Sequence, residues 1–428
     1  MSKPNKLSIL KSKKLWPFKG LLTILLLCGF SASISSNSTR RPFIAYDFIR
    51  MDLNYLESFN DTVLYPFYRK LEKLSHLKEG HVQVLHLGDS HIQADLFSGW
   101  VRQRFYEDPR FGMSGRGFIF PFKAAKTNNP YNYRVNKIGE WKGQRCSISY
   151  HKSDWGLAGI TASTTDAFAK ISVNVNVDSL YNYEGDRIDV YYPVNDKTQY
   201  TPVIQSLSNN AKLINLDKHD QYISFKFDKE IGNFRLSFRK ENKEQNQFTL
   251  RGFNVKDDKH EGLSYSSVGV NGAKATSFLR CKQLSKEIEA LQPDLVILSL
   301  GTNDAFVPPF LPNVFHQKYA DLIDAFQKVQ PNLPILITTP GDNFRNSRYI
   351  NKDNSIAVEK LYQIAKDKHL SLWDFYQVMG GLSSIQYWSE KSMTSKDKVH
   401  LNRRGYQYQG ELLYRAIIND YDKFASSH

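Results

Sequence analysis

Two kinds of hydrophobic periodicity alternate along this chain, and they constrain its fold more than any other feature. Short apolar runs at 81–87, 293–300 and 333–339 each end beside glycine and polar residues. Segments with helical spacing lie between or after the later runs, at 317–330, 355–368 and 403–418. Strands that alternate with helices predict an α/β fold, in which a parallel sheet is covered by helices on both faces.

Residues 134–256 have a different pattern, in which polar turns separate strand-like runs that alternate residue by residue. Examples are "AKISVNVNV", "RIDVYY", "YISFKFD", "FRLSFRK" and "FTLRGFNVK". Such alternation without a convincing helix predicts a β-sandwich. A chain of 428 residues exceeds the usual limit for one core. We therefore expect an α/β domain formed by 42–133 and 257–428, interrupted by a β domain at 134–256.

Two further helices are expected in the first part of the α/β domain, at 55–77 and 94–105. A glycine-rich loop, "FGMSGRGFIFP", follows the second of them.

The N-terminal 33 residues have the basic-then-apolar order of a secretory signal. Six lysines precede an apolar run of 14 residues, and this run is shorter than the roughly 20 residues that a spanning helix needs. Small residues at 31–33 offer a cleavage site, whereas Leu27 before Cys28 argues against lipid attachment. We expect a periplasmic or secreted protein, and an uncleaved membrane anchor at 20–34 is the alternative.

The basic balance belongs partly to this leader, since removing its six lysines takes the net charge from +14 to +8 (14 − 6). The remaining charge is diffuse and accompanies no nucleic-acid-binding motif, so no nucleic-acid partner is expected. It could still favour an anionic polymer. The oligomeric state is left open.

Only Cys146 and Cys281 remain after signal removal, which rules out a disulfide framework. Two buried free thiols are the simplest interpretation, and their pairing stays open. No Cys, His and carboxylate cluster has metal-ligand spacing. We expect neither a metal nor an organic cofactor.

Polar groups follow three strand-like runs at the sheet edge where α/β proteins bind ligands. They are Gly88-Asp89-Ser90, residues 269–272 and residues 301–304. Near the C-terminus "DKVH" places Asp397 three residues before His400. A hydrolytic serine needs an imidazole base, and that imidazole needs a carboxylate acceptor. Ser90, His400 and Asp397 supply these three groups.

The oxyanion formed by serine attack needs donors held in place beforehand. The Ser90 amide at a helix start, the flexible Gly272 backbone and the Asn303 side chain offer them. Each element alone has a plainer interpretation. Ser90 could be a helix cap, "GTND" a turn, and "DKVH" a surface segment.

Four motifs in one order, "GDSH", "VNGA", "GTND" and "DKVH", resemble blocks I, II, III and V of the SGNH/GDSL hydrolases. The resemblance implies a flavodoxin-like three-layer α/β/α fold. It also implies that Ser90 is the nucleophile, His400 the base and Asp397 its partner. Ser90, Gly272 and Asn303 would then form the oxyanion hole. Block I reads "GDSH" where the family has "GDSL", at a position that performs no chemistry.

A narrower similarity rests on "GDSHIQADLFSG", "GRGFIFP", the long β insertion and "GLSYSSVGVNGA". These features are similar to peptidoglycan O-acetylesterases, whose hydrolase domain contains a β-sandwich like a carbohydrate-binding module. The similarity implies a serine esterase that removes acetyl groups from a cell-envelope polysaccharide. A glycan-binding or scaffold protein on a hydrolase fold is the alternative, as are an acetyltransferase and an esterase for another acetylated glycan.

Several neighbouring side chains are expected to have supporting roles. We expect His91 to lie at a helix surface or pocket wall, His86 in the core, and Asp89 and Asp304 to brace their turns. Arg116 could pin a loop or touch substrate. Tyrosines of the β domain could stack on sugars or pack in the core; the candidates are Tyr181, Tyr183, Tyr191 and Tyr192.

Overall fold

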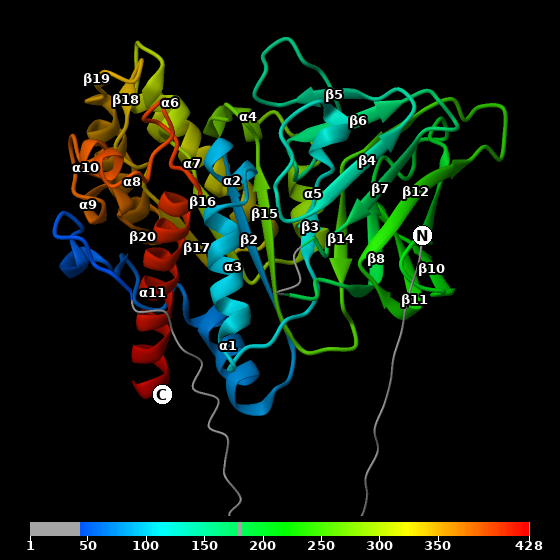
Figure 1. Cartoon of the computed structure of the whole chain (residues 1–428), viewed down its shortest axis with the longest axis horizontal. Coiled ribbons are helices and arrows are strands. Elements are labelled where there is room, and N and C mark those ends of the chain that lie inside the picture. The colour runs from blue at the N-terminus through cyan, green and yellow to red at the C-terminus, as the bar shows by residue number, and fades with distance from the viewer. Residues whose placement is uncertain (1–42, 178–180, 428) are drawn as a thin grey trace, which may run out of the picture. The chain divides into compact units, whose positions relative to one another are not determined.

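A six-stranded, mostly parallel sheet organises the computed structural model, which describes residues 43–177 and 181–427 (Figure 1). Only the edge pair β1–β20 is antiparallel among the pairs of this sheet. The central strands are continuous buried runs, as expected for strands covered on both faces. In order across the sheet, the strands are β1 (Leu56–Ser58), β20 (Ser371–Trp373), β17 (Ile335–Thr338), β16 (Leu295–Ser299), β2 (His81–Gly88) and β15 (Gly262–Gly269).

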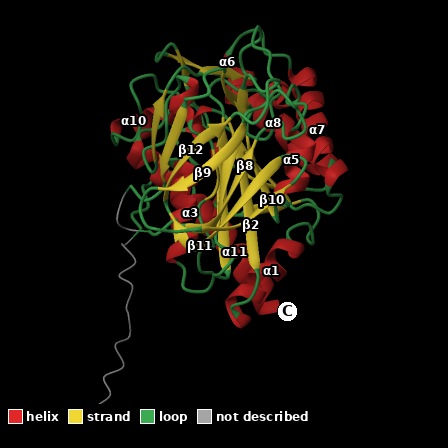
Figure 2. Cartoon of the chain, turned by 90° about the vertical axis from the view of Figure 1, so that its right-hand side faces the viewer, coloured by secondary structure: helices red, strands yellow, loops and turns green. Residues whose placement is uncertain are grey.

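Helices cover both faces of this sheet, which confirms the predicted α/β class. One group contains α1 (Tyr65–Leu77), α3 (Phe97–Glu107) and α11 (Arg403–Ser427), which pack on one another. The other contains α5 (Leu284–Leu291), α7 (Pro312–Val329) and α8 (Asp353–Asp367). Figure 2 shows strands between α3 on one side and α7 and α8 on the other.

Short elements complete this part of the fold. They are η1 (Met51–Leu53), α2 (Ser90–Gln93), η2 (Phe122–Ala125), α4 (Ala275–Phe278), α6 (Thr302–Phe306), α9 (Phe375–Val378), α10 (Ile385–Glu390) and the hairpin of β18 (Phe344–Arg345) with β19 (Tyr349–Ile350).

Three antiparallel sheets form the β part, as the alternating pattern predicts. A five-stranded sheet contains β10 (Leu213–Lys218), β11 (Tyr222–Ile231), β8 (Gly185–Tyr191), β14 (Gly252–Lys256) and β3 (Gly117–Ile119). A four-stranded sheet contains β4 (Arg134–Ile138), β7 (Lys170–Asn174), β12 (Asn233–Arg239) and β9 (Thr201–Ser206). A three-stranded sheet contains β13 (Phe248–Leu250), β6 (Ile160–Thr164) and β5 (Lys142–Arg145).

Aromatic side chains join the two larger sheets into a sandwich. Phe234 on β12 meets Phe253 on β14 edge to face, with ring centroids 5.3 Å apart. Tyr183, Tyr191 and Tyr192 are buried. These three tyrosines therefore pack in the core, and of the four candidates only Tyr181 is partly accessible, where its hydroxyl donates to Glu107.

The β part and the α/β part share one hydrophobic core and one compact unit from Ala45 onward. β3 belongs by sequence to the first α/β segment, yet it pairs with β14 of the β part. A buried ion pair also crosses between the parts, because Arg251 Nε lies 2.8 Å from Glu287 Oε1 on α5. The same carboxylate accepts the Leu157 N–H at 2.6 Å. The domain boundaries stay a prediction, and in the described residues the two parts are joined by both apolar and polar contacts.

The helix expected over 55–77 is wrong in its first half. Residues 56–58 form β1, and α1 begins only at Tyr65. Asn60 turns the chain by accepting the Thr62 N–H and hydroxyl, and Pro66 starts the helix.

Cys281 lies in "TSFLRCKQLSKEIEAL", whose spacing is helix-like, but the structure interrupts this segment between α4 and α5. Within that gap Gln283 donates its N–H to Trp155 of the β part instead of continuing a helix. Cys146 and Cys281 are both buried free thiols. The C-terminal helix, in contrast, continues beyond the expected residue 418 to Ser427.

The predicted signal or anchor and Cys28 lie outside the described residues. Within the part of the chain that the structure describes, no helix is both long and apolar enough to cross a membrane.

A buried carboxylate, Asp95, binds side chains from three separate segments. Arg102 of α3 donates to both of its oxygens, at 2.8 and 3.2 Å. Arg116 of the glycine-rich loop and Asn132 donate to Oδ2 at 2.7 and 2.6 Å, and Ser98 donates to Oδ1 at 2.8 Å. Burial alone would raise the pKa of Asp95, but Arg102 and Arg116 hold it well below its usual range. Arg116 therefore pins a loop.

Replacing Asp95 with alanine should destabilise the fold strongly, because two buried guanidinium groups would lose their counter-charge. We expect a loss of about 3–5 kcal/mol in the free energy of unfolding, measured by urea denaturation. Asp52→Ala is the matched control, since it breaks an exposed ion pair with Arg50 and should leave the midpoint unchanged. Equal midpoints for the two variants would contradict a central role of the Asp95 cluster.

Candidate active site

Ser90 lies at a sharp corner between the central strand β2 and the short helix α2. Gly88 permits this corner, because a Cβ there would lie 2.4 Å from the Ile92 side chain and 2.6 Å from the Ser299 carbonyl oxygen. Asp89 caps α2 by accepting the His91 N–H at 3.0 Å. Ser90 is then the first residue of the helix, with its hydroxyl at the carboxyl edge of the sheet.

The three predicted catalytic side chains form one hydrogen-bonded chain. Ser90 Oγ lies 2.8 Å from His400 Nε2, and His400 Nδ1 lies 2.7 Å from Asp397 Oδ2. Asp397 Oδ1 also accepts the backbone N–H groups of Val399 and His400, each at 3.0 Å. This turn brings the side chains of Asp397 and His400 into hydrogen-bonding contact.

The Asp397 carboxylate fixes the orientation and tautomer of the imidazole. Partial burial raises the pKa of Asp397, but the hydrogen bond from His400 outweighs it and brings the pKa below its ordinary value. An ionised Asp397 accepts a proton donated by Nδ1, which leaves Nε2 as the acceptor for the Ser90 hydroxyl. The arrangement can therefore remove the serine proton.

Two backbone amides near Ser90 are available to a developing oxyanion. Neither the Ser90 N–H nor the Gly272 N–H has an acceptor among residues 43–177 and 181–427. Gly272 has φ +76°, and its Cβ position has no atom within 4 Å. The turn at Gly272 is thus unobstructed around its Cβ position.

Asn303 is close to the nucleophile turn, but its amide is already engaged. Its Nδ2 donates to Asp89 Oδ2 at 3.0 Å and to the Ala273 carbonyl at 3.1 Å. Its role as an oxyanion donor stays a prediction, and it requires one of these N–H groups to exchange its partner.

The two acidic neighbours brace their turns. Asp89 is buried and joins α2 to Asn303, and burial raises its pKa to about 7. Asp304 accepts the Ala275 N–H, and burial raises its pKa to about 6. Neither carboxylate contacts the Ser90 hydroxyl, so both have the supporting role expected of them.

His91 is closer to the triad than the sequence suggests. Its half-buried ring stacks on the His400 ring, with centroids 4.9 Å apart and planes at 29°. Its Nδ1 pairs with the Tyr406 hydroxyl at 2.7 Å. Removal of the ring from water, together with the neighbouring His400, lowers the pKa of His91 to about 3. A neutral His91 therefore forms the wall against which the base is held.

His86 is a satisfied core histidine, as predicted. Its ring nitrogens pair with the Tyr265 hydroxyl at 2.8 Å and with Ser299 Oγ at 2.7 Å. Burial lowers its pKa to about 3, so it stays uncharged.

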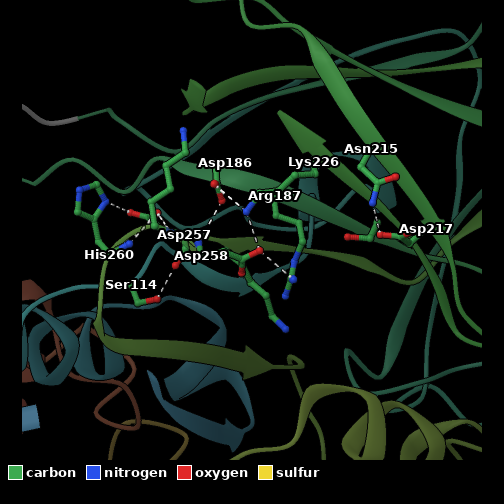
Figure 3. Close-up of polar contacts among 12 residues, drawn as sticks. Ser114, Asp186, Arg187, Asn215, Asp217, Lys226, Asp257, Asp258 and His260 are labelled. Atoms are coloured by element: carbon green, nitrogen blue, oxygen red, sulfur yellow. Dashed lines mark hydrogen bonds and ion pairs between the residues drawn. The ribbon is translucent and has the colours of Figure 1, made fainter. Parts of the chain in front are cut away.

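One group of side chains in the described ranges could hold a metal ion by its spacing: Glu230, Asp257 and His260. His260 Nδ1 lies 2.6 Å from Asp257 Oδ2 and 3.5 Å from Glu230 Oε1. The Asp257 hydrogen bond raises the pKa of His260, which favours an imidazolium ion pair over a metal ligand. Figure 3 shows basic side chains interleaved with this acidic surface, among them Arg187 and Lys226. The group shares no residue with the triad.

Comparison with known proteins agrees with this geometry. Residues 251–408 match the GDSL-like Lipase/Acylhydrolase family. The chain carries a GDSL-type acylhydrolase domain. This domain makes the chain an esterase. A search of curated proteins finds no match.

Solved structures match the acylhydrolase over different lengths. A peptidoglycan O-acetylesterase structure is similar over 86% of this chain and 99% of its own, with a TM-score of 0.71 and 20% identity. A family two carbohydrate esterase from Cellvibrio japonicus covers 68% of this chain and 99% of its own, with a TM-score of 0.29 and 11% identity. The first likeness shows that the fold, including its β part, occurs in a solved structure.

The family match contains four of the five predicted site residues and omits the nucleophile. Gly272, Asn303, Asp397 and His400 lie inside 251–408, whereas Ser90 precedes the β part of the acylhydrolase. The β insertion separates the nucleophile from the other blocks, and the parallel pairing of β2 with β15 and β16 restores their proximity.

Asp89→Asn should change how stability depends on pH. Because its pKa is raised to about 7, native Asp89 keeps a proton that the unfolded chain releases near its ordinary value of 3.8. The free energy of unfolding of the wild type therefore falls as pH rises from the unfolded pKa of 3.8 to the folded pKa of about 7. The variant has no carboxyl group at this position and lacks that fall. We expect the free energy of unfolding of the variant, relative to that of the wild type, to be higher at about pH 8 than at about pH 4.5 when both are measured by urea denaturation. An unchanged difference would mean that Asp89 is ionised throughout.

Proposed function

We propose that this chain is a serine acetylesterase that removes O-acetyl groups from a cell-envelope polysaccharide, with peptidoglycan as its polymer. The main support for this proposal is the hydrogen-bonded chain from Ser90 through His400 to Asp397. The peptidoglycan O-acetylesterase that shares the fold over nearly its whole length supports this choice of polymer.

The accessibility of the site supports a polymeric substrate. The side chains of His400 and Asp397 are 36% and 48% exposed. An acetyl group on a long glycan can reach such a site without the chain entering a tunnel. The N-terminal segment supports an envelope location as a further part of the proposal, as a cleaved signal or an anchor.

The reaction needs only the groups described. His400 Nε2 takes the Ser90 proton, and Ser90 Oγ forms a bond to the acetyl carbonyl carbon. The oxyanion is held by the Ser90 and Gly272 amides, and by Asn303 if its amide turns to it. The tetrahedral intermediate then collapses, the bond from the carbonyl carbon to the sugar oxygen breaks, and His400 gives its proton to that oxygen, which leaves as a hydroxyl group. Water activated by His400 releases acetate from the acyl-serine and restores the free enzyme.

Ser90→Ala should lose several orders of magnitude in turnover of p-nitrophenyl acetate, because no other hydroxyl is hydrogen-bonded to His400 among the described residues. Asn303→Ala should lose about 10²–10³-fold if it donates to the oxyanion. Ser206→Ala is a suitable control, since that hydroxyl is bonded to Asn209 of the β part and makes no contact with the triad or the Asp95 cluster. Wild-type turnover by Ser90→Ala would refute the esterase assignment at this site.

The polymer is tested by acetate release from O-acetylated peptidoglycan beside O-acetylated xylan. We expect preferential release from peptidoglycan, and preference for xylan would contradict that substrate. Glycan binding without acetate release from either polymer would indicate a binding or scaffold protein. Transfer of acetyl to a sugar acceptor without free acetate would indicate an acetyltransferase, because both reactions pass through the same acyl-serine.

A further inference from the structure

A hollow of about 270 Å³ lies among segments that also carry the active-site residues, and it takes no part in the mechanism above. It lies between four segments that are far apart in sequence. Gln93 ends α2, Asn271 precedes Gly272, Asn128 and Tyr131 come from the loop that leads into the β part, and Arg403 begins α11. Three of these segments also carry Ser90, Gly272 or His400. The hollow is therefore built from segments that also position the reacting groups.

Arg403 gives the hollow its charge. The guanidinium carbon lies 3.9 Å from the centroid of the Tyr131 ring. A guanidinium group stacked in this way uses its face and keeps its edge N–H donors free for a carboxylate. No carboxylate of the described residues pairs with Arg403, whereas Arg102, Arg104 and Arg110 all have acidic partners.

The remaining polar groups of the hollow suit sugar hydroxyls. The Asn128 side-chain amide has no hydrogen-bond partner in the described ranges. The Asn271 side chain makes only a long contact, 3.4 Å from Thr127 Oγ1. No acidic residue lines the hollow. Its lining consists of one cation, one aromatic ring, four amide side chains and the apolar side chains of Ala94 and Leu96.

The hollow is also held in shape before any ligand arrives. Gln93 accepts the Asn271 N–H at 2.7 Å and donates to the Asn128 carbonyl at 2.9 Å, which ties two walls together. The loop with Tyr131 is anchored at its far end, where Asn132 donates to buried Asp95. A site that needs little ordering loses less binding free energy on association.

We propose that this hollow is a subsite for an acidic glycan, in which Arg403 pairs with a carboxylate carried by the acetylated sugar or its substituent. Asn128 and Asn271 bind hydroxyl groups of the same unit, and Tyr131 holds the guanidinium in place. This inference rests on the proposed esterase function and deepens it. The enzyme selects acetylated anionic glycans over neutral ones.

Arg403→Gln tests the subsite, with Arg404→Gln as the matched control. Arg404 is the next residue of α11, is also exposed, and is bonded instead to the Tyr46 hydroxyl and the Lys391 carbonyl. The readout is the ratio of kcat/KM for O-acetylated peptidoglycan fragments to kcat/KM for p-nitrophenyl acetate. Arg403→Gln should lower this ratio about 10–100-fold, mainly through KM, because one charge-assisted contact is lost. Arg404→Gln should keep the wild-type ratio.

Tyr131 provides a second test that does not remove charge. Tyr131→Ala should lower the ratio in the same direction, because the guanidinium loses the surface that orients it, whereas Tyr131→Phe should retain the wild-type ratio. Rising salt should weaken wild-type activity on the anionic fragments and have little effect on the residual activity of Arg403→Gln.

Comparison of fragments with and without their peptides identifies the source of the carboxylate. If Arg403→Gln no longer changes the ratio once the peptides are removed from the fragments, the carboxylate is on the peptide. If the effect of Arg403→Gln persists, the carboxylate is on the sugar. An unchanged ratio in Arg403→Gln, or an equal loss on neutral acetylated xylan, would overturn the subsite. Its failure is distinct from failure of the esterase, which would appear as an active Ser90→Ala variant or as no acetate release by the wild type.

Discussion

One buried carboxylate, Asp95, fixes the relative positions of α3, the glycine-rich loop and the loop that enters the β part. It lies five residues after Ser90 and binds Arg102 of α3, Arg116 of the glycine-rich loop and Asn132 of the loop that enters the β part. A charge removed from water is tolerated only when it is fully partnered. The helix that follows the nucleophile, the β part and the hollow beside Arg403 therefore depend on the same set of hydrogen bonds.

The order of residues in the nucleophile turn follows from space and hydrogen bonding. Gly88 leaves room for Ile92 and for the Ser299 carbonyl, and Asp89 caps the helix and binds Asn303. Ser90 then occupies the first helical position, where its amide has no intrahelical acceptor. His91 supplies the flat face under His400. The fourth position, where the family has leucine, thus carries a ring that contacts the base.

The periodicity of the chain predicted most of the fold, because buried strands and helix faces leave a local trace in sequence. It failed over 56–58, where three residues pair with a distant edge strand and no local signal marks that pairing. The triad was predictable because its three residue types lie in motifs of fixed order. The stacking of Arg403 on Tyr131 was not, since 272 positions separate them (403 − 131) and only the folded sheet brings both loops together. A clue did exist in "HLNRRGY", where a cation follows the base by three residues.

The Arg251–Glu287 ion pair has a consequence for how the β part entered this architecture. Insertions that act as independent cassettes can be removed or exchanged, because their ends close over a polar surface. Here excision of 134–256 would remove Arg251 and the Leu157 amide, and Glu287 would keep a carboxylate with neither of these partners. Burial already raises the pKa of Glu287 to about 7 with those partners present. A copy of the β part moved to another domain would therefore need a new acceptor for Arg251 and for the Leu157 amide in place of Glu287.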